Sequence, residues 1–237
     1  MDKFYVVITG SDGSGKETQT KKLEENLKLM GLKVKKISFP NYDSPSSGAV
    51  KLYLCGALSQ NPDEVNPYQA SLLYAMDRFC TMKQFLNEDN DADVVIFDRY
   101  AESNIIHQAI KIKEEKEIKE FIDWLDDIEF KKLGIPRPNL TLFLNMPTEV
   151  SFKLASERKG LKNEMSKDIH ENNYNFLKRS YDFGMKVAKD LGWVVVDCCD
   201  NNGLRTREAI ADDCLAIVKN ALIQNGVLTH DVDYLTK

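Results

Sequence analysis

The stretch that decides the fold is "VVITGSDGSGKETQT", residues 6–20. It joins an apolar, β-branched run to a glycine-rich turn, and a segment with helical periodicity follows. Gly10, Gly15 and Lys16 have the G-x-x-x-x-G-K spacing of a phosphate-binding loop. In such a loop the backbone N–H groups and the positive end of the following helix attract phosphate oxygens, which the lysine also reaches. We therefore predict that the phosphates of a nucleotide bind to Gly10, Ser11, Asp12, Gly13, Ser14, Gly15, Lys16, Glu17 and Thr18.

One position of the loop departs from this pattern. A serine or threonine normally follows the lysine, because its hydroxyl coordinates the magnesium ion carried by the nucleotide, whereas this chain has Glu17. Magnesium usually keeps several water ligands, so Thr18 and Asp98 are able to hold it through waters. A carboxylate in the first turn of a helix is also favourable. We therefore expect a working loop in which Asp98, through a water, is the main protein group that holds Mg²⁺.

Length, composition and charge limit the kind of protein. The 237 residues are enough for one large α/β domain or two small ones, and 43% of them are hydrophobic, which allows a substantial core. A net charge of -5 argues against a general nucleic-acid coat, which needs a broad basic surface. No apolar run approaches the roughly 20 residues that span a bilayer, and the N-terminus lacks a signal-peptide pattern. We expect a cytoplasmic protein that binds neither nucleic acid nor a membrane.

Five apolar, β-branched runs are spread along the chain, at residues 3–10, 33–40, 92–99, 139–146 and 192–199. Long segments with helical periodicity separate them, as in residues 17–31. Near-continuous apolar strands that alternate with helices are typical of a parallel sheet buried on both faces. We therefore predict an α/β fold of the P-loop NTPase type, with a five-stranded parallel sheet flanked by helices.

A second candidate site lies in "VVIFDRY", residues 94–100. Asp98 and Arg99 end an apolar strand, and the carboxyl ends of parallel strands open onto the ligand crevice. A carboxylate there is able to hold a magnesium-bound water or to orient an acceptor oxygen. An adjacent guanidinium binds a phosphate through two parallel hydrogen bonds. We therefore predict catalytic roles for Asp98 and Arg99 beside Lys16.

Two charged segments lie between the expected strands. Residues 110–132 mix charged and apolar side chains, which predicts an amphipathic helical pair with one solvated face. Residues 156–168, "SERKGLKNEMSKD", contain basic residues and a glycine but few large apolar side chains. That composition fits a plain surface loop, or a mobile lid that carries cations over the phosphates of a nucleotide. In a nucleotide enzyme we expect a short lid at approximately 156–170.

The ordered set of motifs resembles the thymidylate kinase family. Its members typically carry counterparts of "GSDGSGKETQT" (10–20), "SFPNY" (38–42), "YAMDR" (74–78), "DRYAESNIIHQ" (98–108) and "GIPRPNLTLFLNMP" (134–147) in this order. The resemblance covers residues 3 to about 199 and implies a single domain over residues 1–237. It also implies a homodimeric nucleoside-monophosphate kinase that transfers the γ-phosphoryl group of Mg-ATP to dTMP.

The resemblance further implies roles for individual residues. The loop residues 10–18 would hold ATP, Asp98 would lie near magnesium and the transferred phosphoryl group, and Arg99 would bind the acceptor phosphate. Arg158 lies where family members without a basic residue before the loop lysine supply a catalytic one from the lid. The residues implied to bind the acceptor nucleotide are Asp12, Phe39, Pro40, Tyr42, Tyr74, Arg78, Arg99, Asn104, His107 and Gln108.

Four members of the acceptor set bear on which nucleotide is accepted. Tyr74 matches the aromatic position that stacks on the pyrimidine, and Arg78 matches the position that reads its carbonyl; their i, i+4 spacing places both on one helix face. Tyr42 stands where the family usually has an arginine for the acceptor phosphate. His107 stands where many bacterial members have a tyrosine thought to sense the absence of a 2′-hydroxyl.

Two alternatives remain open from the sequence. The departures at Tyr42 and His107 are compatible with a kinase for another deoxynucleoside monophosphate, or for a deoxynucleoside. If Glu17 repels the metal, the chain is instead a nucleotide-binding regulator without turnover. A panel of acceptors tested with ATP separates both alternatives from a dTMP kinase.

Overall fold

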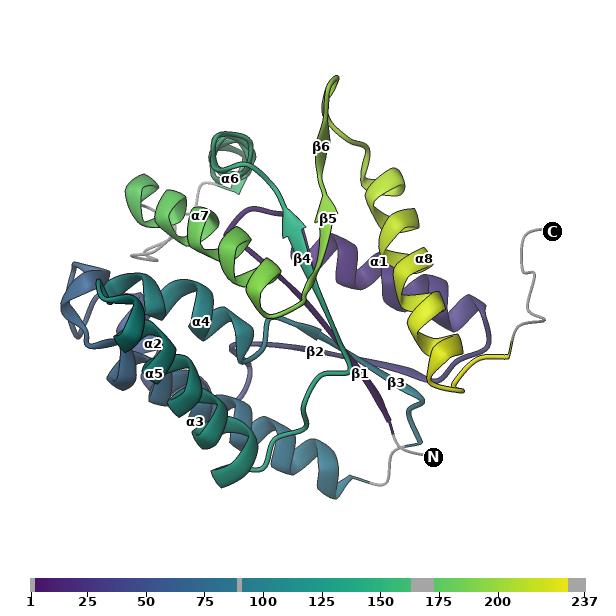
Figure 1. Cartoon of the computed structure of the whole chain (residues 1–237), viewed down its shortest axis with the longest axis horizontal. Coiled ribbons are helices and arrows are strands. Elements are labelled where there is room, and N and C mark those ends of the chain that lie inside the picture. The colour runs from purple at the N-terminus through teal and green to yellow at the C-terminus, as the bar shows by residue number, and fades with distance from the viewer. Residues whose placement is uncertain (1–2, 89–90, 163–172, 230–237) are drawn as a thin grey trace.

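A computed structural model describes residues 3–88, 91–162 and 173–229 of the chain. Five parallel strands form one sheet in the order β2-β3-β1-β4-β5, which lies between helices on both faces (Figure 1). Each strand lies inside one of the five apolar runs, so the predicted five-stranded parallel sheet flanked by helices is confirmed. The strands are β1 (Phe4–Gly10), β2 (Val34–Ser38), β3 (Val94–Asp98), β4 (Leu140–Asn145) and β5 (Val194–Asp197).

Helices connect these strands and account for most of the remaining described residues. They are α1 (Lys16–Leu29), α2 (Gly48–Leu54), α3 (Pro67–Asn87), α4 (Glu102–Gln108), α5 (Glu115–Asp126), α6 (Thr148–Lys162), α7 (Tyr174–Asp190) and α8 (Arg207–Gln224). A small antiparallel ribbon of β6 (Cys199–Asp200) and β7 (Gly203–Leu204) follows β5, and no sequence pattern indicated it. No helix in the described part of the chain is long and apolar enough to cross a membrane.

One face of the sheet packs against α1 and α8 (Figure 1). Leu23 and Leu27, one turn apart on α1, are almost completely buried against Val6 and Ile8 of β1. Leu222 of α8 belongs to the same apolar cluster. The helical spacing read from the sequence therefore marks the core face of α1.

The opposite face of the sheet packs mainly against α3, α4 and α7 (Figure 1). Phe97 of β3 and Tyr100, just after it, stack with ring centroids 4.2 Å apart. Met82 and Phe85 of α3 join this cluster. The aromatic layer packs next to the segment that carries Asp98 and Arg99, which is where the predicted site begins.

The charged segment 110–132 differs from its prediction. A 3-10 turn (Ala109–Lys111) comes first, and α5 then continues without a break into a π-helical turn, Asp127–Lys132. The prediction of a helical pair was therefore wrong, while the amphipathic character is confirmed, because Phe121 and Leu125 are buried on the inner face of α5. The π turn places Glu129 in the core, which the ion pair described below explains.

The strand register brings the predicted site residues to one edge of the sheet. Asp98 at the end of β3 lies opposite Ile8 of β1 on one side and opposite Ser38 of β2 on the other. Gly10, the last residue of β1, starts the glycine-rich turn at the same edge. The loop and the Asp98-Arg99 pair therefore share the carboxyl edge, as expected for a ligand crevice in a parallel sheet.

Candidate active site

The glycine-rich loop runs from the end of β1 to the start of α1. Gly13 and Gly15 have backbone φ angles of 79° and 86°, in the left-handed region that side chains with a Cβ avoid. Gly15 is the N-cap residue of α1, so the free N–H groups of the first helical turn face the loop. This geometry is that of an anion-binding helix terminus.

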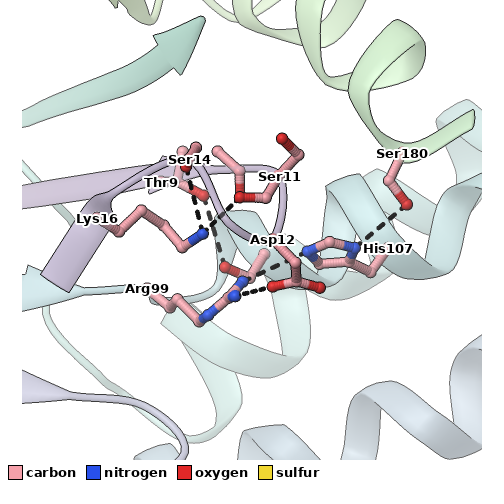
Figure 2. A network of polar contacts seen from close by, with 10 residues as sticks. Thr9, Ser11, Asp12, Ser14, Lys16, Arg99, His107 and Ser180 are labelled. Carbon is pink, nitrogen blue, oxygen red and sulfur yellow. Dashed lines mark hydrogen bonds and ion pairs between the residues drawn. The ribbon is translucent and has the colours of Figure 1, made fainter. Parts of the chain in front are cut away.

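Lys16 folds back over the loop (Figure 2). Its ammonium Nζ donates hydrogen bonds to the carbonyl oxygens of Ser11, at 2.7 Å, and Gly10, at 3.2 Å, and to Ser14 Oγ at 3.4 Å. The side chain is buried. A fixed positive charge therefore stands in the middle of the loop, where the phosphates of a nucleotide are expected.

Arg99 connects the loop to the helices on the other side of the site (Figure 2). Its guanidinium donates a short hydrogen bond to Asp12 of the loop and lies 3.5 Å from His107 Nε2. Arg99 is the only non-glycine residue with positive φ, 64°, in the described ranges 3–88, 91–162 and 173–229. Burial works against its charge, but Asp12 and Asp98 hold the pKa of Arg99 above its ordinary value. The guanidinium is therefore a permanent cation in a backbone conformation that functional sites often impose.

His107 is a neutral acceptor in this network. Burial, together with the nearby Arg99 and Lys16, lowers the pKa of His107 to about 4. Its Nε2 faces the Arg99 guanidinium and its Nδ1 lies 3.3 Å from Ser180 Oγ of α7. Because Nε2 must accept from arginine, the hydrogen-bond pattern assigns the proton to Nδ1, which donates to Ser180. Ser180, which no sequence motif indicated, thus links α7 to the loop.

Asp98 lies at the end of β3 and is 9% exposed. Among the described residues no side chain donates a hydrogen bond to its carboxylate. Burial raises the pKa of Asp98 above its usual range, while Lys16 and Arg99 pull it down. Such a carboxylate is suited to a cation or an ordered water.

The helices α3 and α4 carry five of the ten residues predicted to bind an acceptor nucleotide. Asn104 Nδ2 donates to the carbonyl oxygen of Ser71 at 3.3 Å, across the two helices. Ser71 Oγ and Gln108 Oε1 are buried and have no hydrogen-bond partner in the described ranges. Tyr74 is half-buried and meets Tyr53 edge-on, with ring centroids 6.2 Å apart. Buried polar atoms without a partner are typical of places where a ligand or an ordered water binds.

The turn after β2 is tied to α3. Phe39 packs beside Tyr100, with ring centroids 5.6 Å apart, and the Phe39-Pro40 peptide bond is cis. Asp77 of α3 accepts hydrogen bonds from the Asn41 backbone N–H, at 2.8 Å, and from Ser46 Oγ. Tyr42, in the same turn, is half exposed at 50%. Asp77 belongs to the "YAMDR" motif, but its anchoring role was not recognised from the sequence.

Arg78 has a partner that the sequence did not reveal. Its Nε lies 3.1 Å from both carboxylate oxygens of Glu129, and Nη2 makes a short hydrogen bond to the same group. Nη1 points to the carbonyl oxygen of Tyr100 at 3.5 Å. Both members of the ion pair are buried. Arg78 does share a face of α3 with Tyr74, and its reading of a base carbonyl remains a prediction.

The predicted lid is only partly described. Residues 156–162 belong to the end of α6, residues 163–172 lie outside the described residues, and so does the side chain of Arg158. Glu17 is exposed and Thr18 half-buried in the first turn of α1. The structure thus gathers Lys16, Asp98 and Arg99 at one edge of the sheet, which α3 and α4 cover on one face (Figure 1). The arrangement is able to bind two anionic groups side by side.

Comparison with known proteins agrees with this geometry. The family model "Thymidylate kinase" matches residues 8–205. The thymidylate kinase of Mycobacterium tuberculosis (strain H37Rv) is 32% identical over 156 residues, which cover 65% of this chain and 70% of the relative. The thymidylate kinase of a Prochlorococcus marinus strain is 29% identical over 202 residues, which cover 83% of this chain and 86% of the relative.

A solved structure supports the fold. The thymidylate kinase of Candida albicans superposes with a TM-score of 0.62, at 22% identity and with 92% of each chain covered. At 22% identity this similarity shows the fold alone. Because the family model matches most of the sequence, this chain belongs to the thymidylate kinase family.

Proposed function

We propose that this protein transfers the γ-phosphoryl group of ATP to dTMP, giving dTDP and ADP. The observation that carries the proposal is the position of Lys16 inside a glycine-rich loop, at the same sheet edge as Asp98 and Arg99, in a chain of this family. Phosphoryl transfer needs two phosphate groups held in line and their charge neutralised, more than it needs covalent chemistry. Lys16 and Arg99 would supply the neutralising positive charge, and Asp98 would hold the metal ion that adds to it.

ATP is the ligand proposed for the loop. The backbone N–H groups between Gly13 and Lys16 and the positive end of α1 would hold its phosphates, and the Lys16 ammonium would contact the β- and γ-phosphates. Ser11 Oγ, which is buried without a hydrogen-bond partner among the described residues, supports a ligand at this place. The loop assignment therefore remains Gly10 to Thr18, with Lys16 in a catalytic role.

The acceptor nucleotide is proposed to lie between Arg99 and the predicted base-binding side chains of α3 and α4. In the structure Arg99 forms an ion pair with Asp12. On binding the acceptor phosphate, Arg99 would release Asp12. Tyr74 would stack on the base, and the unsatisfied oxygens of Ser71 and Gln108 support a polar ligand between the helices. The other residues proposed to contact the acceptor are Phe39, Pro40, Tyr42, Arg78, Asn104 and His107.

Magnesium is the cofactor proposed for the reaction. Bound together with ATP, it would supply positive charge that stabilises the charge developing on the transferred group. Asp98 fits this role, because its buried carboxylate accepts no hydrogen bond from the described side chains. In proteins one or two carboxylates plus substrate phosphates usually suffice for this ion. Asp98 would therefore hold the metal through a water.

Several finer assignments accompany the proposal. Leu52 on α2 and Leu72 and Met76 on α3 expose 53%, 42% and 48% of their surface, which supports a homodimer through these helices. Sedimentation equilibrium of the protein tests this. A single domain over 1–237, a lid at 156–170 carrying Arg158, and a cytoplasmic location remain predictions.

The test of the proposed function is a coupled assay for ADP formation with ATP, magnesium and each deoxynucleoside monophosphate. We expect dTMP to have the highest kcat/KM. A higher kcat/KM for another monophosphate, or for a deoxynucleoside, would identify that compound as the acceptor in place of dTMP. ATP binding without ADP formation for any acceptor would contradict the enzymatic assignment altogether.

A further inference from the structure

The left-handed backbone of Arg99 has to be fixed from both sides. Its φ angle is 64°, and such a conformation persists only where the surrounding structure imposes it. On the N-terminal side the sheet does this, because the Arg99 N–H donates to the carbonyl oxygen of Ile8 at 3.1 Å. The Asp98 carbonyl oxygen also accepts a hydrogen bond from the Phe39 N–H at 3.0 Å. On the other side, the neighbour that has to be fixed is Tyr100.

Tyr100 is completely buried and is held both at its backbone and at its hydroxyl. Its carbonyl oxygen accepts hydrogen bonds from the Ser103 N–H at 3.2 Å and from Arg78 Nη1 at 3.5 Å. At the far end of the side chain, the hydroxyl donates to the carbonyl oxygen of Pro136 at 3.0 Å. Burial raises the pKa of Tyr100 well above its ordinary value, so the hydroxyl keeps the proton that it donates. These contacts restrain the turn that carries Arg99.

Two of these contacts originate in one segment, residues 129–136. Glu129 fixes Arg78, because both carboxylate oxygens lie 3.1 Å from Nε and one of them also makes a short hydrogen bond to Nη2. The Ile135 N–H donates to the carbonyl oxygen of Glu129 at 3.2 Å, which keeps Pro136 close to the π turn. Apolar side chains of similar volume are often as stable as a buried ion pair, and π-helical turns are frequent at functional sites. Stability alone therefore does not account for this arrangement.

We propose that Tyr100 and Glu129 are positioning residues for Arg99. Tyr100 keeps Arg99 in its left-handed conformation. Glu129 acts one step further away, by holding the Arg78 side chain against the Tyr100 carbonyl oxygen. In this conformation the Arg99 guanidinium points to Asp12 of the loop (Figure 2). The inference rests on the proposed function for its last step, in which this guanidinium binds the acceptor phosphate.

The length of the arginine side chain makes the expected effect large. A small rotation of the backbone at Arg99 moves the guanidinium much further than it moves the Cα atom. A misplacement of about 1 Å in a group that orients a substrate can cost about 100-fold in rate. Weakening the contacts of Tyr100 should therefore affect the acceptor, and should leave the binding of ATP to the loop at residues 10–18 unchanged.

The test uses Tyr100→Phe, which keeps the ring that stacks on Phe97 and removes only the hydroxyl. Tyr181→Phe is the matched control, because the Tyr181 hydroxyl donates to Asn145 Oδ1 at 2.7 Å, between α7 and the end of β4. The first readout is the ¹⁵N NMR signal of the Arg99 side chain in the protein without ligand. Its loss in Arg99→Lys assigns this signal.

We expect the Arg99 signal to shift in Tyr100→Phe and its guanidinium protons to exchange faster with water, while Tyr181→Phe matches the wild type. An identical Arg99 signal in Tyr100→Phe and the wild type would overturn the proposal. Equal shifts in both variants would also overturn it, since they would reflect a general loosening of the fold. This readout needs no turnover, so it still decides if no acceptor is phosphorylated, an outcome that would refute the proposed function alone.

Steady-state kinetics separate positioning from a purely structural role. In Tyr100→Phe, kcat/KM for dTMP should fall at least about tenfold through a higher KM for dTMP, while the KM for ATP stays unchanged. A variant that merely loses folded protein has a lower kcat and unchanged KM values for both substrates. That pattern in Tyr100→Phe would overturn the proposal.

Glu129→Gln tests the more distant contact and also covers the case in which Tyr100→Phe does not fold. The amide has the shape of the carboxyl group but no charge, so Arg78 should be held less firmly against the Tyr100 carbonyl oxygen. The Arg99 signal of Glu129→Gln should again differ from that of the wild type. An unchanged signal would refute the positioning role of Glu129.

Discussion

Gly13→Ala should destabilise the loop far more than Gly15→Ala, although both glycines have left-handed backbone. A Cβ atom on Gly13 would lie 2.6 Å from the backbone oxygen of Ser151 in α6, whereas a Cβ on Gly15 would meet no atom within 4 Å. The φ angles are nearly equal, 79° and 86°. The pair therefore separates the cost of the backbone conformation from the cost of the collision.

The expected magnitudes follow from these distances. Alanine in the left-handed region destabilises the folded state by about 1–2 kcal/mol. Alanine also lowers the conformational entropy of the unfolded chain relative to glycine, which offsets about 0.4–1 kcal/mol of that destabilisation. Gly15→Ala should thus lower stability by about 0–1.6 kcal/mol. At Gly13 a backbone oxygen cannot rotate away, so overpacking adds about 1–3 kcal/mol.

Thermal unfolding of the ligand-free protein measures this difference. For a chain of 237 residues, about 1 kcal/mol corresponds to about 2–4 °C, so Gly13→Ala should melt about 2–12 °C below Gly15→Ala. The KM for ATP serves as a second readout, because the loop must move to relieve the contact. Equal Tm values for the two variants would refute the reasoning, since the close approach of α6 would then contribute nothing.

Three further predictions concern the site itself. Lys16→Ala and Asp98→Ala should each lower kcat at least about 100-fold, the usual effect of losing an electrostatic stabiliser of about 2.7–4 kcal/mol; near-normal kcat in steady-state assays would remove the assigned roles. Ser180→Ala should raise the KM for dTMP while the KM for ATP stays unchanged, and ¹⁵N NMR should show His107 protonated on Nδ1 in the wild type but on a mixture of nitrogens in the variant. An Nε2–H tautomer in the wild type would contradict this. Glu17→Thr should reduce the magnesium concentration needed for half-maximal activity, because a direct hydroxyl ligand replaces a negative charge; a large increase would make Glu17 a metal ligand.

The parts of the fold that the sequence predicted correctly depend on local signals. Strand positions follow from β-branched apolar runs, and the loop follows from glycines at fixed spacing before a helix. The shared edge of the loop and Asp98 also follows, because parallel strands must end on the same side. Each inference needs only neighbouring residues and one general rule of sheet topology.

The partners of the site residues were not predictable in this way. Glu129 is 51 positions from Arg78, and Ser180 is 73 positions from His107. No periodicity relates such pairs, and Glu129 looks like one more charge in a segment rich in lysine and glutamate. The π turn that buries it changes the helical phase, so the pattern predicted a solvated face where an internal ion pair forms.

The state of Arg99 bears on the choice between a nucleotide and a nucleoside as acceptor. The guanidinium is already neutralised by the Asp12 carboxylate and also lies near His107. An acceptor that binds at Arg99, as proposed, would therefore bind by exchange, and only a group that interacts more strongly than one carboxylate would displace Asp12. A phosphate dianion, with up to two charges and three acceptor oxygens, meets this condition through a bidentate contact, whereas the neutral hydroxyl of a nucleoside does not. The ion pair therefore favours a nucleoside monophosphate over a deoxynucleoside.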